Sequence, residues 1–111
     1  MKKLNLSIVI PAQNEKENIS LLYGRLTNVL KRLKKNYEII FIDDGSTDNT
    51  YQEILKLRKK DKKVGVIKHR GNWGKSMALQ SGFEVAKGEI VITMDADLQD
   101  TPEEIPNFIK K

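Results

Sequence analysis

The sequence contains no cysteine and only one histidine, His69. The lack of cysteine excludes a disulfide scaffold, thiol catalysis and thiolate metal sites, and one histidine cannot form a histidine-rich zinc site. No apolar run approaches the roughly 18 residues of a membrane span. The Met-Lys-Lys start also lacks the apolar stretch and cleavage site of a signal peptide. We therefore expect a cytoplasmic protein.

The length of 111 residues, with 39% hydrophobic and 32% charged residues, fits one small soluble domain or part of a larger one. The net charge of +5 fits a solvated basic surface, or an anionic partner such as nucleic acid, an anionic membrane or a phosphorylated substrate. Basic residues cluster at 31–35 and 56–63. The segment Asp95–Glu104 holds five carboxylates and no basic residue, which calls for a metal ion or for solvent.

Strand and helix patterns alternate along the chain, which predicts an α/β fold. We expect a doubly wound, Rossmann-like parallel sheet of about four strands with helices on both faces. Pro11 is predicted to end the first strand, and Gly88 to stop the third helix in a left-handed conformation. The predicted strands are Leu6–Ile10, Glu38–Ile42, Val64–Lys68 and Glu89–Met94. The predicted helices span Lys16–Leu33, Ser46 or Thr47 to about Lys60, and Gly74–Ala86, and a last one starts at the capping box of Thr101 with Pro102.

The segments that follow the four predicted strands contain most of the unusual polar residues. These segments are Pro11–Glu15, Asp43–Asp48, His69–Lys75 and Asp95–Asp100. Because the carboxyl ends of parallel strands meet at one edge of a sheet, and ligands bind there, we expect a site at this edge.

Asp95, Asp97 and Gln99 alternate along the segment after the fourth strand. In an extended segment this spacing places all three side chains on one side. Their oxygens suit Mg²⁺ or Mn²⁺, which also takes ligands from phosphates and water. The alternative is a polar strand end followed by helix-capping acids.

The acid pair Asp43 and Asp44 follows the second predicted strand, and the two side chains are expected to point in different directions and to have different roles. One can bind the N–H groups of a ligand while the other holds the loop, or both can be turn and cap residues. Gln13, Asn14 and Glu15 after the first strand can bind a nucleobase or ribose. Glu15 can instead stabilise a helix N-terminus.

After the third strand, Arg70, Lys75 and a glycine-flanked helix start suit phosphate binding, although the spacing of a P-loop is absent. Trp73 is predicted to pack against the protein rather than stack on a ligand. His69 is interpreted as a loop histidine, since the sequence places no nucleophile beside it.

Four pieces of the sequence resemble the family 2 glycosyltransferases, which have the GT-A type of nucleotide-sugar-binding fold. The pieces are residues 8–15 (IVIPAQNE), 43–48 (DDGSTD), 72–75 (NWGK) with Ala78 and Gly82, and Gly88 followed by 94–102 (MDADLQDTP). They match in order and spacing and cover nearly the whole chain. The last piece looks like the polyprenyl-phosphate branch, which includes dolichol-phosphate mannose synthase and undecaprenyl-phosphate transferases. The chain would be the N-terminal part of such a domain, with residues 1–111 binding the nucleotide-sugar.

The resemblance implies roles for individual residues, with Asp43 in reserve for Asp44 because the sequence does not separate the two. Asp95 and Asp97 would be catalytic, with Asp95 near the sugar or ribose. Asp97 and Gln99 would hold Mg²⁺ or Mn²⁺. The residues implied for nucleotide binding are Pro11, Ala12, Gln13, Glu15, Ile42, Asp44, Lys75 and Ala96.

The implied reaction is a metal-dependent, inverting transfer of a sugar from a UDP- or GDP-sugar to a polyprenyl phosphate, with peripheral contact at the cytoplasmic face of a membrane. This length of chain is expected to bind the donor weakly and to transfer no sugar alone. The alternatives are a saccharide acceptor, a receiver-like phosphoacceptor module and a nucleic-acid-binding module. Receiver domains carry their acid pair after the first strand, and a nucleic-acid module lacks an evident recognition helix here, so we expect no nucleic-acid partner.

Overall fold

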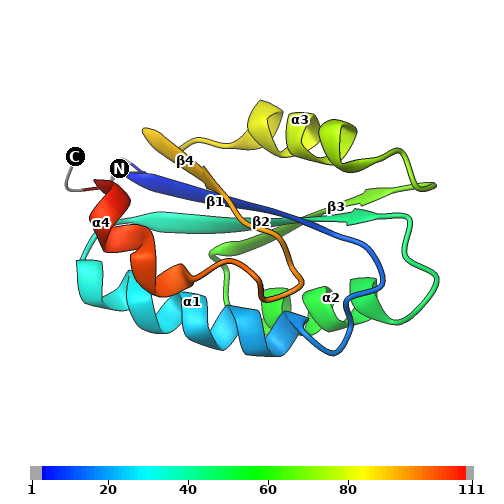
Figure 1. Cartoon of the computed structure of the whole chain (residues 1–111), viewed down its shortest axis with the longest axis horizontal. Coiled ribbons are helices and arrows are strands. Elements are labelled where there is room, and N and C mark those ends of the chain that lie inside the picture. Colours follow the sequence, from blue (N-terminus) through cyan, green and yellow to red (C-terminus); the bar gives the residue numbers. More distant parts are fainter. Residues whose placement is uncertain (1–3, 110–111) are drawn as a thin grey trace.

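The structure, a computed structural model, describes residues 4–109 and has the predicted α/β architecture (Figure 1). The strands are β1 (Leu6–Ala12), β2 (Tyr37–Asp44), β3 (Val64–His69) and β4 (Ile90–Thr93). The helices are α1 (Ile19–Leu33), α2 (Thr50–Lys60), α3 (Lys75–Val85), the 3₁₀ turn η1 (Pro102–Glu104) and α4 (Ile105–Ile109).

The four strands form one parallel sheet in the order β3-β2-β1-β4. The chain moves outward from β1 to β3 and then returns past β1 to β4. Crossovers of one hand place α1 and α2 on one face and α3 on the other, as Figure 1 shows, with α4 beside α1. The point where the strand order reverses lies between β1 and β4.

The core lies on both faces of the sheet, which explains the nearly continuous apolar runs in β1 and β2. Alternate residues of β1, including Ile8 and Ile10, pack in the larger core with α1 and α2. Val9 points the other way and packs with Ile42 and with Ala78 of α3 in the smaller core.

Pro11 does not end the first strand as predicted, because β1 continues to Ala12 and Pro11 pairs with Ile42. The carbonyl of Val9 accepts a hydrogen bond from Met94, so the backbone groups of Val9 and Pro11 face the β4 side. The ladder with β4 stops at Val9. A missing N–H at Pro11 therefore removes no ladder bond.

The predicted starts of the first two helices are also wrong. A turn at 16–18 precedes α1, which begins at Ile19 rather than Lys16. Neither Ser46 nor Thr47 caps α2, which begins at Thr50. Ser46 instead accepts the backbone N–H of Asn14 (2.9 Å), so its hydroxyl joins two loops.

Two predicted helix signals have different roles in the structure. Ala86 ends α3 in an extended conformation, and Gly88 is not left-handed. A Cβ at Gly88 would collide with the backbone of Leu6 and Ser7, so glycine is needed here for close packing against β1. Thr101 makes no side-chain cap. Pro102 occupies the first position of η1, as predicted.

None of the helices within residues 4–109 combines the length and apolar character that a membrane span needs. Each helix runs antiparallel to the strand before it, so the C-terminal ends of α1 and α2 lie at the sheet edge where the strands begin. The basic residues Lys31 and Arg32 of α1, and 58–60 of α2, are at these ends.

Candidate functional site

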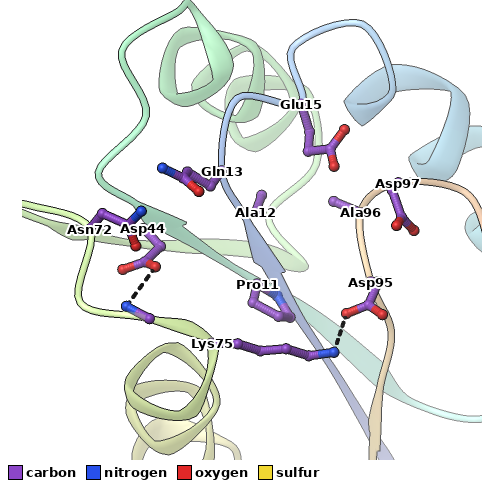
Figure 2. Close-up of a pocket in the computed structure, with 11 residues that line it drawn as sticks. Pro11, Ala12, Gln13, Glu15, Asp44, Asn72, Lys75, Asp95, Ala96 and Asp97 are labelled. Carbon is purple, nitrogen blue, oxygen red and sulfur yellow. Dashed lines mark hydrogen bonds and ion pairs between the residues drawn. The ribbon is translucent and has the colours of Figure 1, made fainter.

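A pocket of about 260 Å³ lies at the carboxyl edge of the sheet, where the strand order reverses between β1 and β4. Crevices at this position are the usual ligand sites of open α/β sheets. Figure 2 shows side chains from four segments converging there. The lining residues are Pro11, Ala12, Gln13, Glu15, Asp44, Asn72, Gly74, Lys75, Asp95, Ala96 and Asp97.

Most residues that the sequence indicated meet in this pocket, but Ile42 and Gln99 are not among its lining residues. The Ile42 side chain is fully buried toward α3. Asn72 and Gly74 line the pocket without having been proposed as site residues. The signal for them was present, because both belong to the glycine-flanked helix start after β3.

The segment after β4 is not extended, which corrects the premise that placed Gln99 beside the two aspartates. Ala96 and Asp97 lie in a turn, and Leu98 has a left-handed backbone (φ 68°). The backbone N–H of Gln99 donates to Asp97 Oδ1 (3.1 Å), and that of Asp95 donates to Asp100 (2.7 Å). The turn leaves the two carboxylates of Asp95 and Asp97 in the pocket wall.

Lys75, the first residue of α3, reaches across the pocket to Asp95, with Nζ 2.8 Å from Oδ1 (Figure 2). The hydrogen bond and the charge of Asp95, with smaller contributions from Asp100 and Asp97, raise the pKa of Lys75. The ammonium is therefore held beside the acidic segment as a fixed positive charge.

Asp44 ends β2 and is buried by the loop that starts α3. Its carboxylate accepts the backbone N–H groups of Trp73 (2.9 Å) and Gly74 (3.0 Å) and contacts Nδ1 of His69 (3.0 Å). Burial alone would raise the pKa of Asp44, but these bonds outweigh it and lower the pKa below its ordinary value. Asp43 points elsewhere and accepts the N–H of Ser46 (3.2 Å). Asp44 is the member of the pair that lines the pocket.

Asn14 holds the loop after β1 against the loop after β2. Its side-chain oxygen accepts the N–H of Thr47 (2.8 Å), and the N–H of Glu15 donates to Thr50 Oγ1 (2.9 Å). Gly45, in a left-handed conformation (φ 72°), lets the backbone of Gly71 approach, because a Cβ would collide with it. Three loops are thus fastened together, which fixes the wall that carries Glu15 and Asp44.

His69 and Trp73 differ from their sequence interpretation. His69 is not a loop histidine but the last residue of β3, with only 3% of its surface exposed. Trp73 stacks on the His69 ring at 4.3 Å between centroids and remains 53% exposed. Packing against the protein is thus confirmed for one face of the indole. Arg70 is exposed and does not line the pocket.

The chemistry of the pocket fits a divalent cation. The carboxylates of Asp95 and Asp97 offer hard oxygen ligands, and a lysine ammonium already lies against one of them. Mg²⁺ and Mn²⁺ commonly use one or two carboxylates and complete their coordination with water and substrate phosphates. The described residues contain no group of three or more acidic, histidine or cysteine side chains that could hold a metal ion by themselves.

Comparison with known proteins shows the family to which the chain belongs. Residues 7–111 match the sequence profile of glycosyl transferase family 2. The chain is 45% identical over 107 residues to the undecaprenyl-phosphate 4-deoxy-4-formamido-L-arabinose transferase of Aeromonas hydrophila, covering 95% of this chain and 32% of that protein. The chain spans about a third of the length of the curated relatives it matches.

The fold is similar to that of solved glycosyltransferases. A mannosyltransferase from Pyrobaculum calidifontis, in complex with GDP-Man and Mn²⁺, has a TM-score of 0.77 and 22% identity, covering 99% of this chain and 32% of that one. S. aureus TarS in complex with UDP-GlcNAc has a TM-score of 0.75 and 25% identity, covering 96% and 30%. With the family match extending over residues 7–111, the chain belongs to glycosyl transferase family 2 and has the GT-A fold of these enzymes.

Proposed function

We propose that residues 1–111 form the donor-binding part of a metal-dependent, inverting glycosyltransferase. The donor is a UDP- or GDP-sugar, and the acceptor is a polyprenyl phosphate. The observation that carries this proposal is the meeting of Asp44, Lys75, Asp95 and Asp97 in one pocket at the switch point of the sheet. The name of the A. hydrophila relative, an undecaprenyl-phosphate transferase, supports the lipid-phosphate acceptor over a saccharide.

Different lining residues bind different parts of the donor. Glu15, Gln13 and Asp44 bind the nucleoside, together with the backbone around Pro11, Ala12 and Ala96. Lys75 binds the diphosphate or the ribose, and Asp95 lies near the sugar or ribose. Ile42 and Gln99 remain predicted contacts from the sequence resemblance, Gln99 with the cation. The GDP-Man and the UDP-GlcNAc bound to the two structural neighbours support a nucleotide-sugar here.

Asp97, with Asp95 beside it, is the carboxylate we assign to Mg²⁺ or Mn²⁺, and the Mn²⁺ of the P. calidifontis structure supports this assignment. The bound cation would supply stabilisation of the negative charge on the leaving nucleoside diphosphate. The acceptor phosphate attacks the anomeric carbon from the face opposite the leaving group, which inverts that carbon. Because a lipid phosphate is already anionic at neutral pH, the reaction has less need of a strong general base than transfer to a hydroxyl acceptor has.

A lipid acceptor requires contact with a membrane, and we propose that this contact is peripheral and at the cytoplasmic face. The basic ends of α1 and α2 lie at the edge opposite the pocket. A membrane bound at these basic ends would lie on the side of the sheet away from the pocket. We therefore interpret these basic residues as a solvated surface.

The chain spans about a third of the length of the curated relatives it matches. We therefore expect weak donor binding and no sugar transfer by residues 1–111. Sugar transfer by the purified chain of this length would contradict that expectation.

Calorimetric titration of UDP and GDP into the chain, with and without Mn²⁺, tests the proposal. We expect Mn²⁺-dependent binding of one nucleotide, lost in Asp97→Ala and kept in Glu84→Ala, which removes an exposed carboxylate of α3 that does not line the pocket. Undiminished metal-dependent binding by folded Asp97→Ala would contradict it.

A further inference from the structure

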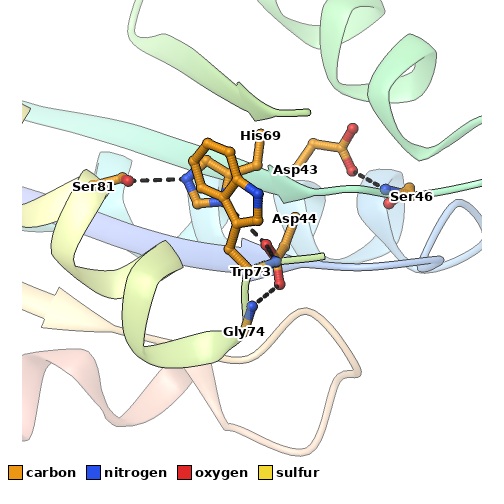
Figure 3. Close-up of polar contacts among 7 residues, drawn as sticks. All are labelled: Asp43, Asp44, Ser46, His69, Trp73, Gly74 and Ser81. Carbon is orange, nitrogen blue, oxygen red and sulfur yellow. Dashed lines mark hydrogen bonds and ion pairs between the residues drawn. The ribbon is translucent and has the colours of Figure 1, made fainter. Parts of the chain in front are cut away.

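His69 is a buried titratable side chain for which the proposed transfer has no use. It ends β3, and both of its ring nitrogens have partners (Figure 3). Nδ1 lies 3.0 Å from Asp44 Oδ1, and Nε2 lies 2.9 Å from the hydroxyl oxygen of Ser81 on α3. The ring therefore connects the end of β2 to the middle of α3.

These partners assign the roles of the two ring nitrogens. An ionised carboxylate can only accept hydrogen bonds, so Nδ1 carries the proton that is donated to Asp44. In the neutral ring Nε2 then accepts the Ser81 O–H. The indole of Trp73 covers one face of the ring, with an angle of 25° between the planes.

The carboxylate that His69 holds faces two ways. On one side Asp44 accepts the N–H groups of Trp73 and Gly74, which immediately precede Lys75 and α3. On the other side Asp44 lines the pocket, together with Gly74 and Lys75. A rotation of the carboxylate away from His69 would change both its orientation toward a ligand and the start of α3.

We propose that His69 is a positioning residue for the nucleotide site, acting through Asp44. Its Nδ1–H fixes the Asp44 carboxylate, which in turn fixes the 72–74 loop and the first turn of α3. The stacked indole of Trp73 holds the imidazole in the required plane. This inference rests on the proposed function, because it takes the pocket to bind a nucleoside diphosphate.

Two substitutions separate positioning from packing. In His69→Asn the side-chain amide occupies the place of Nδ1 and can still donate to Asp44, whereas the contact with Ser81 is lost. In His69→Gln the amide occupies the place of Nε2 and keeps the contact with Ser81, whereas Asp44 loses its donor. Ser81→Ala is the matched control for the bond that His69→Asn loses.

The experiment measures the affinity for UDP and GDP with Mn²⁺ by calorimetry, and the amide hydrogen exchange of Trp73 and Gly74. We expect His69→Gln to lose about tenfold in affinity, the scale of one charged hydrogen bond. His69→Asn and Ser81→Ala should stay within about threefold of the unsubstituted chain by the same scale. Exchange at Trp73 and Gly74 should accelerate in His69→Gln only. Urea unfolding of both His69 variants corrects these values for any difference in overall stability.

Equal affinities of the two His69 variants would overturn the inference and leave the proposed function standing. Binding of neither nucleotide by the folded unsubstituted chain would overturn the proposed function. In that case the exchange rates decide whether His69 positions Asp44, and equal rates at Trp73 and Gly74 in the two variants would overturn the inference as well.

Discussion

Asp44 shows how one side chain links the stability of this domain to pH. Its pKa is lowered from the ordinary 3.8, against the effect of burial, by the donors His69, Trp73 and Gly74. A carboxyl with a lowered folded-state pKa stabilises the fold above its unfolded-state pKa. That contribution is lost as the pH falls from 3.8 through the folded-state pKa.

We predict that Asp44→Asn lowers the free energy of unfolding by about 2 kcal/mol at neutral pH, since it sets an amide against backbone donors. The difference from the unsubstituted chain should shrink below about pH 4. Urea unfolding at several pH values between about pH 6 and about pH 3 measures this difference. The unfolding is monitored by the fluorescence of Trp73, the single tryptophan. The lowered pKa of Asp48 is common to both proteins and cancels. A difference that is constant over this range would contradict the assignment.

Lys75 and a divalent cation compete for the same carboxylate, because Nζ lies 2.8 Å from Asp95 Oδ1. We predict that Lys75→Gln raises the affinity for Mn²⁺ alone about two- to fivefold, the range of an exposed ion pair. It should also weaken nucleotide binding with Mn²⁺ about tenfold, because a charged contact to phosphate is lost. Calorimetry measures both affinities.

Lys56→Gln is the matched control, since Lys56 forms an ion pair of 2.9 Å with Glu53 on α2, away from the pocket. It should change neither affinity. A fall in Mn²⁺ affinity in Lys75→Gln would show that the ammonium does not compete with the cation.

Individual site residues could be predicted from the sequence where they directly follow a strand or begin a helix, because this fixes their place in the fold. Asp95 and Asp97 directly follow a strand, and Lys75 begins a helix, so the carboxyl edge of the sheet collects them. The role of His69 could not be predicted, because its partners Asp44 and Ser81 are 25 and 12 residues away. Such contacts depend on packing, which a local pattern does not contain.

At the scale of elements, apolar periodicity predicted the strands well and their ends poorly. The β1 prediction failed at Pro11 because the effect of a missing N–H depends on which neighbouring strand it faces. The start of α2 was misplaced because Ser46 bonds to Asn14, a residue of another loop, rather than to its own helix. The ends of strands and helices depend on contacts between elements, and local capping patterns contain no information about such contacts.

Gly88 tests one such contact between elements. We predict that Gly88→Ala lowers the free energy of unfolding by about 1–3 kcal/mol, because its Cβ would collide with the backbone of Leu6 and Ser7 in β1. Gly24→Ala in α1 is the control, with open space around the added methyl group. It should raise the free energy of unfolding by about 0.5–1 kcal/mol. Urea denaturation measures both, and equal effects would contradict the packing role of Gly88.

At the scale of the whole molecule, one acidic segment and one group of basic residues lie at opposite edges of the sheet. The acidic segment around Asp95 and Asp97 lies at the carboxyl edge of the sheet, and the basic ends of α1 and α2 lie at the opposite edge. The net charge of +5 alone could have indicated an anionic partner anywhere on the surface. The parallel topology locates the basic residues, because it determines at which edge of the sheet each end of a helix or strand lies.

The same topology leaves β4 at the margin of the sheet, paired with β1 on one side only among the described strands. Ile90 and Val91 of β4 are 42% and 39% exposed, and Phe83 of α3 is 50% exposed. An exposed apolar edge strand can pair with another chain. We therefore predict concentration-dependent self-association of the 111-residue chain, measured by sedimentation velocity.

Val91→Lys should reduce this association, since a lysine on an edge strand opposes pairing with a second edge. Its free energy of unfolding should change by no more than about 0.5 kcal/mol, because the side chain is already partly in water. Leu21→Lys is the matched control: Leu21 is 60% exposed, but it lies on α1 and away from the edge. If both substitutions reduce association equally, apolar exposure in general drives it and the open edge of β4 does not. Loss of association in Val91→Lys alone would assign it to that edge.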